Sequence, residues 1–118
     1  MSSRIDLDRQ LQPGDTFHSD NGEYRLTFQD DGNLVLYNTS DEPLWASGTN
    51  SEEGANGKHI ILQGDGNFVM YDQEQNAVWA SGSNYAAQNP YVLVQDDGNI
   101  CLYDDDVEGC HWETGTSQ

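Results

Sequence analysis

Three stretches of this chain carry matching side chains at every second position: Gln, Asp, Asn and Tyr in each, with one apolar residue among them. An ionised carboxylate only accepts hydrogen bonds, carboxamides both donate and accept, and a phenol can do either. Together they can pair with neighbouring hydroxyl groups while an apolar side chain lies against the carbon–hydrogen face of a ring. The chemistry therefore favours a ligand bearing several hydroxyls, such as a sugar. The three sets are Gln29, Asp31, Asn33, Val35 and Tyr37; Gln63, Asp65, Asn67, Val69 and Tyr71; and Gln95, Asp97, Asn99, Cys101 and Tyr103.

The alternate spacing predicts that the five side chains of one set share a face. On strands that flank a tight turn, alternate residues point to the same side of a sheet. Leu34 and Leu36 fall between the polar residues and should point to the opposite side. A solvated face with turn-capping Asp and Asn would explain the acidic and glycine positions. It does not explain Gln and Tyr at fixed offsets in three copies, which favours a binding role.

The residues around each set have the patterns of short strands and turns. Tyr24, Leu26 and Phe28 alternate with polar residues, as in a half-buried strand. Gly32 and its counterparts Gly66 and Gly98 are expected to supply the positive φ of a tight turn. Large apolar residues at the intervening positions, with a Trp after each set, should form the core. This predicted core is Leu34, Leu36, Trp45, Phe68, Met70, Trp79, Ile100, Leu102 and Trp112.

The repetition extends to the whole chain. The leading Gln stands at positions 29, 63 and 95, so the period is 34 and then 32 residues. Periods of this length indicate a repeat architecture in which no unit can bury its apolar side alone. We therefore expect one domain, residues 1–118, made of repeats at about 11–50, 51–84 and 85–118. Its sheets should meet around a shared interior.

The charge of the chain excludes several classes of partner. Its 118 residues carry 21 acidic and four basic side chains, a formal net charge of −17. Such a surface repels nucleic acid and anionic lipid. No apolar run approaches the roughly 20 residues of a membrane span, so membrane insertion is not expected. The N-terminus lacks the apolar stretch of a secretory signal, which favours a cytoplasmic or non-classically exported protein.

The sequence resembles the bulb-type, snowdrop-like mannose-binding lectins of monocots. Gln-x-Asp-x-Asn-x-Val-x-Tyr is the signature of that family, and three further segments are similar to it. The resemblance implies an all-β fold, the β-prism II, with three four-stranded antiparallel sheets about a pseudo-threefold axis. It also implies a non-enzymatic lectin that recognises terminal mannose or mannose-rich glycans. The further segments are Leu11-Gln12-Pro13-Gly14, Gly22-Glu23-Tyr24-Arg25-Leu26 and Trp45-Ala46-Ser47-Gly48.

The family's residue roles carry over by position. By resemblance, Asp31 and Asn33 would bind the axial 2-hydroxyl of mannose, Gln29 the 3-hydroxyl and Tyr37 the 4-hydroxyl, with Val35 under the ring carbons. The second set matches in full. The third set has Cys101 where the signature has Val, and an acidic loop one residue longer follows it.

The two cysteines stand nine residues apart across the third hairpin. Cys101 should face the same side as Tyr103, whereas Cys110 shares its parity with the core-facing Trp112. The parity argues against a disulfide, although an irregular loop could bring the two thiols within reach.

Other functions are less well supported. The acidic loop Asp104–Glu108 lacks EF-hand spacing, and the resemblance implies sugar binding without metal or cofactor. Adjacent acids on a shallow face do not form a glycosidase cleft, so no enzyme is expected. The alternative is a protein-interaction module of the same fold with degenerate sugar sites, such as a cytoskeletal or bacteriocin-like protein. The tail Thr114–Gln118 is long enough for a homodimer formed by exchange of C-terminal strands, as in the family.

Overall fold

The chain folds into short antiparallel strands. The computed structural model describes residues 3–49, 57–83, 89–104 and 107–116. Among these residues there is no helix long and apolar enough to cross a membrane. The strands are β1 (Arg4–Asp6), β2 (Gln10–Leu11), β3 (Thr16–His18), β4 (Arg25–Phe28), β5 (Leu34–Tyr37), β6 (Pro43–Ala46), β7 (His59–Leu62), β8 (Phe68–Tyr71), β9 (Ala77–Ala80), β10 (Pro90–Val94), β11 (Ile100–Asp104) and β12 (Val107–Glu113).

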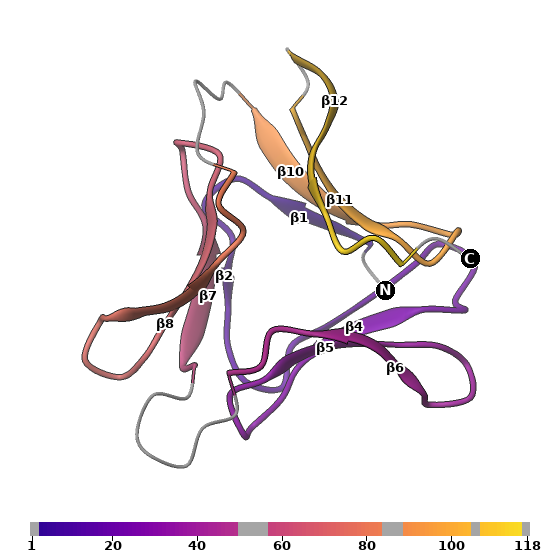
Figure 1. Cartoon of the computed structure of the whole chain (residues 1–118), viewed down its shortest axis with the longest axis horizontal. Helices are drawn as coiled ribbons and strands as arrows, with labels where there is room; N and C mark the ends of the chain where they lie inside the picture. Colours follow the sequence, from indigo (N-terminus) through magenta and orange to yellow (C-terminus); the bar gives the residue numbers. More distant parts are fainter. Residues whose placement is uncertain (1–2, 50–56, 84–88, 105–106, 117–118) are drawn as a thin grey trace.

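Three four-stranded sheets form the sides of a triangular prism. Their strand orders are β3-β4-β5-β6, β2-β7-β8-β9 and β1-β10-β11-β12. Viewed along the short axis, the three sheets surround one central interior (Figure 1). We call their outward surfaces face one, face two and face three, in that order. The architecture confirms the all-β, pseudo-threefold fold expected from the sequence.

The N-terminal segment completes two of the sheets. β1 pairs antiparallel with β10, and β2 pairs with β7. Each later repeat therefore contributes three strands of its own and receives its edge strand from the first 11 residues. The first 11 residues are thus part of the sheets of faces two and three, and they link both sheets to the first.

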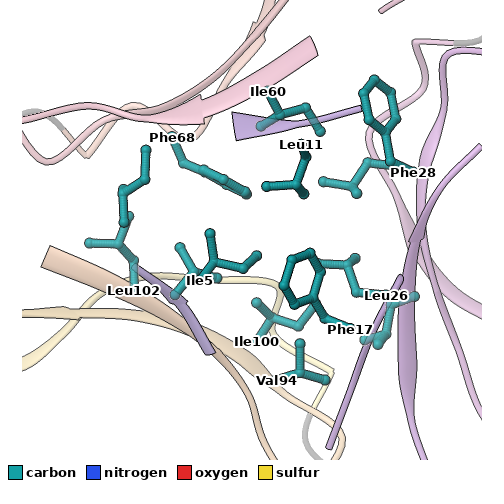
Figure 2. Packing of buried hydrophobic residues seen from close by; sticks show 14 of the residues in the cluster. Ile5, Leu11, Phe17, Leu26, Phe28, Ile60, Phe68, Val94, Ile100 and Leu102 are labelled. Atoms are coloured by element: carbon teal, nitrogen blue, oxygen red, sulfur yellow. The ribbon is translucent and has the colours of Figure 1, made fainter. Parts of the chain in front are cut away.

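The core is built from the inward residues of all three sheets. Among the described residues, fifteen buried apolar side chains form one cluster, and Figure 2 shows side chains from several strands converging on it. Leu34 and Leu36 are in the cluster, as alternation requires. The predicted aliphatic core residues and Phe68 are all buried, which confirms that part of the list. The predicted core list omitted nine further buried residues of the cluster: Ile5, Leu11, Phe17, Leu26, Phe28, Ile60, Leu62, Val92 and Val94.

The three Trp residues pack against one another at the common axis. Their ring centroids are 5.6–5.8 Å apart, and the interplanar angles are 69–74°, an edge-to-face arrangement for every pair. Aromatic rings favour this geometry because the positive edge of one ring meets the negative face of the next. The rings are partly buried against the core cluster, as expected from the sequence. Trp45, Trp79 and Trp112 therefore join the three sheets to one another.

Candidate functional site

A tight turn between the second and third strands of each sheet positions the polar set. On face one, the backbone N–H of Gln29 donates to the carbonyl of Asn33 at 2.8 Å, and Gly32 has a φ of 90°. Residues with a side chain rarely adopt that φ, which explains why a glycine stands at this position. The equivalent N–H to carbonyl distances on faces two and three are both 2.9 Å. The same backbone frame therefore presents all three sets.

The Asp of each set uses one carboxylate oxygen to hold the turn. Oδ1 of Asp31 accepts the backbone N–H of Asn33 at 3.0 Å. Asp65 and Asp97 accept the corresponding N–H groups at 2.9 Å. All three Asp residues are exposed. The second carboxylate oxygen is thus available to accept a hydrogen bond from a ligand.

The Asn of each set is fixed by the segment that follows the fourth strand. Oδ1 of Asn33 accepts the Ser47 hydroxyl at 3.2 Å, the Gly48 N–H at 2.9 Å and the Thr49 N–H at 3.3 Å. Since Oδ1 already has three donors, the Asn33 side chain offers a ligand its Nδ2 amino group. The amide was expected both to donate to a sugar and to accept from it; with Oδ1 engaged within the protein, the donor is the part of that expectation that the geometry supports.

We call this arrangement, in which Asn Oδ1 accepts from the three residues after the fourth strand, the clamp. It recurs on faces two and three. On face two, Asn67 Oδ1 accepts Ser81, Gly82 and Ser83, and on face three Asn99 Oδ1 accepts Thr114, Gly115 and Thr116. The last hydroxyl of each clamp also donates to the turn glycine carbonyl, at 2.6–2.8 Å. From the sequence, Trp45-Ala46-Ser47-Gly48 was noted for its resemblance to the family, and no role in supporting the Asn was predicted for it. The signal was a repeated Ser/Thr-Gly-Ser/Thr tripeptide after each Trp.

Gln and Tyr of each set form a hydrogen-bonded pair. The Nε2 amide of Gln29 donates to the Tyr37 hydroxyl, and Gln95 donates to Tyr103 in the same way. The Gln63 to Tyr71 distance is 2.5 Å. On faces one and two the phenol oxygen accepts from the amide and its own proton is free to be donated outward, while Gln Oε1 remains as an acceptor. The pair on these two faces therefore presents one donor and one acceptor side by side. On face three the Tyr103 hydroxyl is also hydrogen-bonded to Cys101.

The apolar member of each set lies at the floor of the site. Val35 and Val69 are 3% and 4% exposed, so a ligand can touch only a small part of each side chain. Their cross-strand partners are Ala46 and Ala80. The corresponding pair on face three is Cys101 and Glu113. Faces one and two thus share an apolar floor, and face three does not.

The residue paired with each Tyr differs between the faces. Arg25 lies over the Tyr37 ring, with Cζ 4.4 Å from the centroid, and His59 stacks on Tyr71 at 5.3 Å. Tyr91 contacts Tyr103 at 5.7 Å. A hollow of about 510 Å³ is lined by His59 and its neighbours, and one of about 260 Å³ by Arg25 and its neighbours. The three Tyr rings therefore have chemically distinct neighbours.

Face three also differs in its thiols. The Nδ2 group of Asn99 donates to Cys101 Sγ at 3.3 Å, so the amide that is a free donor elsewhere already has a partner here. Burial raises the pKa of the Cys101 thiol to about 12, and the hydrogen bond with Cys110 acts in the same direction. Burial likewise raises the pKa of Tyr103 to about 12. Both groups are protonated near neutral pH.

The expectation that Cys110 points toward the core, as Trp112 does, is wrong. Its side chain is exposed, and its Sγ lies within 4.8 Å of both Cys101 Sγ and a Glu113 carboxylate oxygen. A register shift between β11 and β12, between Leu102 and Asp104, breaks the simple alternation. Both cysteines are free thiols. Of the acidic loop, Asp104 is buried and accepts the Asn89 N–H at 3.0 Å, while Asp105 and Asp106 lie outside the described residues.

Comparison with known proteins identifies the fold and the family. The family model described as D-mannose binding lectin matches residues 15–84. Among solved structures, a monomeric mannose-binding lectin from Gastrodia elata is 34% identical with a TM-score of 0.85, covering 99% of this chain and 100% of that chain. The snowdrop (Galanthus nivalis) agglutinin, in complex with methyl-α-D-mannoside, is 27% identical with a TM-score of 0.78, covering 99% of both chains.

Another relative is similar over part of its length. The B-type lectin plumieribetin of Scorpaena plumieri is 50% identical over 40 residues, which is 34% of either chain. The match thus spans about a third of that relative's length. These relatives are lectins, which confirms the prediction that the chain is not an enzyme. By fold and by sequence, the chain belongs to the D-mannose binding lectin family, the bulb-type lectins with three-sheet prism architecture.

Proposed function

We propose that this lectin binds terminal mannose, or mannose-rich glycans, through the polar sets on its three outward faces. The observation that carries the proposal is the repetition of one hydrogen-bonding arrangement. On each face the turn fixes Asp, the clamp fixes Asn, and Gln is paired with Tyr. Polar groups held in place before binding lose less entropy when a ligand arrives.

The groups left for a ligand complement the hydroxyls of a sugar. Asp31 supplies a carboxylate acceptor, Asn33 an Nδ2 donor, Gln29 an Oε1 acceptor and Tyr37 an O–H donor. Two donors and two acceptors are thus available, so neighbouring hydroxyls can both donate and accept. The axial 2-hydroxyl is assigned to the Asp and Asn, the 3-hydroxyl to Gln and the 4-hydroxyl to Tyr, by resemblance. Mannoside complexes of the snowdrop and Polygonatum cyrtonema lectins support the choice of mannose.

Useful affinity requires more than one site. A shallow face with four or five contacts should bind a monosaccharide with a dissociation constant on the order of millimolar, about 4 kcal/mol. Faces one and two carry complete sets, and their engagement by one branched glycan would raise the overall affinity without new contacts. Face three carries the Cys101 substitution and is expected to bind most weakly.

A homodimer formed by strand exchange is part of the proposal for larger glycans. In the single chain β12 pairs with β11, and Thr114 and Thr116 belong to the Asn99 clamp. Exchange would therefore transfer the clamp of face three to the partner chain. Light scattering at several concentrations measures the mass, and a single-chain mass throughout would contradict the dimer.

Paired Asp→Asn changes test the sugar sites. In Asp31→Asn with Asp65→Asn, the new Oδ1 can still accept the turn N–H, but the outward acceptor becomes a donor. Titration with methyl α-D-mannoside, followed by chemical shifts, should lose the responses of faces one and two while the unfolding temperature stays close to that of the wild type. A control with the same charge change, Asp30→Asn with Glu74→Gln, uses exposed residues and should bind as the wild type does.

The mannoside titration also distinguishes the proposed lectin from the alternative function, a protein-interaction module. An interaction module with degenerate sugar sites would show no shift changes with mannoside at tens of millimolar, and its binding to a protein partner would persist in excess mannose. Either result would refute the lectin sites proposed here.

A further inference from the structure

Face three brings together three side chains with the donor atoms of a metal site. The Sγ atoms of Cys101 and Cys110 and a carboxylate oxygen of Glu113 all lie within 4.8 Å of one another. A tetrahedral zinc site with bonds of about 2.3 Å to sulfur needs ligand atoms about 3.8 Å apart. Movements of about 1 Å by these side chains would close the site, and Cys110 and Glu113 are exposed and able to move.

The three donors reach one face because of two local features. Cys101 and Glu113 are cross-strand partners on β11 and β12, so their side chains project to the same side of the sheet. The register shift between Leu102 and Asp104 brings Cys110 to this side as well. At the equivalent positions, face one has Val35 with Ala46, and face two has Val69 with Ala80. The donor set is therefore specific to face three.

A second contact prepares Cys101 to act as a ligand. The Nδ2 group of Asn99 donates to Cys101 Sγ at 3.3 Å, and Asn99 itself is 6% exposed and held by the Thr114–Thr116 clamp. Hydrogen bonds from outside the first shell orient metal ligands and stabilise the charge on a coordinating thiolate. The Cys110 thiol now donates to the Trp112 carbonyl at 2.9 Å, a contact that would be released when the thiol loses its proton.

We propose that Cys101, Cys110 and Glu113 bind a soft divalent cation such as Zn²⁺ on face three. Two thiolates and a carboxylate match the ligand preference of zinc and cadmium, and they do not match that of calcium or magnesium. On binding, both S–H bonds break, two metal–sulfur bonds form, and two protons leave for solvent. No oxidant or reductant takes part. A water molecule would fill the fourth position. The site is independent of sugar binding at faces one and two.

Titration of the reduced protein with Cd²⁺ tests the site. Each chain should bind one equivalent, with the ultraviolet absorption of thiolate-to-cadmium charge transfer, and Zn²⁺ should displace it. Binding should also protect Cys110 from alkylation by iodoacetamide. The double variant Cys101→Val with Glu113→Ala reproduces the floor of faces one and two and should lose the absorption while keeping the fold. Cys110→Ser, at an exposed position, should lose it as well.

Glu113→Ala alone should weaken Cd²⁺ binding at least about tenfold, since losing a direct ligand costs no less than losing an outer-shell partner. Glu74→Gln, an exposed residue on another hairpin, is the control and should bind Cd²⁺ as the wild type does. The proposal is overturned if the reduced wild type gives no charge-transfer absorption with excess Cd²⁺. It is also overturned if the Cys101→Val, Glu113→Ala protein retains that absorption.

Discussion

The Nδ2 group of Asn99 donates a hydrogen bond to Cys101 Sγ at 3.3 Å, a contact that Val35 and Val69 cannot provide on the other two faces. The Nδ2 group has two N–H donors, and on face three one of them is engaged with Cys101 Sγ, so a sugar hydroxyl competes with the sulfur for it. A neutral hydrogen bond contributes about 1 kcal/mol net, which corresponds to about fivefold in affinity. Cys101 at the floor of face three therefore makes the Nδ2 group of Asn99 a weaker hydrogen-bond donor for a sugar.

Cys101→Val should strengthen mannoside binding on face three. The change gives face three the same floor residue as faces one and two and releases the Asn99 amide. The dissociation constant, measured from the shifts of face-three amides in metal-free buffer, should fall about fivefold. Faces one and two of the same protein serve as internal controls. An unchanged dissociation constant would show that the sulfur contact does not limit binding.

Asn33→Ala should destabilise the fold as well as abolish binding on face one. The alanine leaves the Ser47 hydroxyl and the N–H groups of Gly48 and Thr49 without their acceptor. The loss should cost about 2 kcal/mol or more of unfolding free energy, since partly buried donors are left unsatisfied. Urea denaturation measures it, with Gln73→Ala, an exposed residue, as the control. A variant as stable as the wild type would mean that the clamp contributes little.

Tyr71→Phe should weaken sugar binding on face two with little effect on stability. The ring and its stacking on His59 remain, and only the outward O–H donor and the acceptor for Gln63 are lost. Loss of one hydrogen bond should reduce the affinity of face two about five- to tenfold. Mannoside titration followed by chemical shifts measures it. Tyr24→Phe, at a ring packed on the core, is the matched control and should leave all three affinities unchanged.

Much of the fold could be predicted from the sequence because the same alternation of inward and outward residues occurs in each of the three repeats. Alternation along a strand places Leu34 and Leu36 inside and Val35 and Tyr37 on the other side of the sheet, and the repeat carries this assignment to every sheet. The mutual packing of the three Trp rings likewise follows from one large apolar residue per repeat. Local pattern and long-range packing agree at these positions.

Local sequence patterns did not predict the contacts between segments that are far apart in the chain. β1 and β2 are three and two residues long, too short for a period to be seen, yet they complete two sheets. The Asn33 clamp joins residues 14–16 positions apart, so local spacing did not reveal that Oδ1 was already occupied. Cys110 was misplaced because a register shift ends the alternation on which the prediction depended.

Asp72→Asn should lower stability at neutral pH but not in acid. Asp72 is buried at the β8–β9 hairpin, where Oδ1 accepts the N–H groups of Asn76 and Glu74, both at 2.9 Å. The hydrogen bond from Asn76 is the main cause that lowers the pKa of the Asp72 carboxyl in the folded protein. A carboxyl whose pKa is lower when folded adds stability above its unfolded pKa of about 3.9, and loses it as the pH falls through the folded value.

The stability difference between wild type and Asp72→Asn should therefore be largest above about pH 5 and shrink as the pH falls below the unfolded pKa of about 3.9. Thermal unfolding of both proteins at pH 7 and in acid measures it. Comparing the two proteins at each pH removes the general effect of protonating the other acidic residues, which lowers the repulsion within a chain of net charge −17. Asp20→Asn, at an exposed position, controls for the loss of one negative charge. If the difference between wild type and Asp72→Asn does not change with pH, the ionised carboxylate does not stabilise the hairpin more than a neutral amide would.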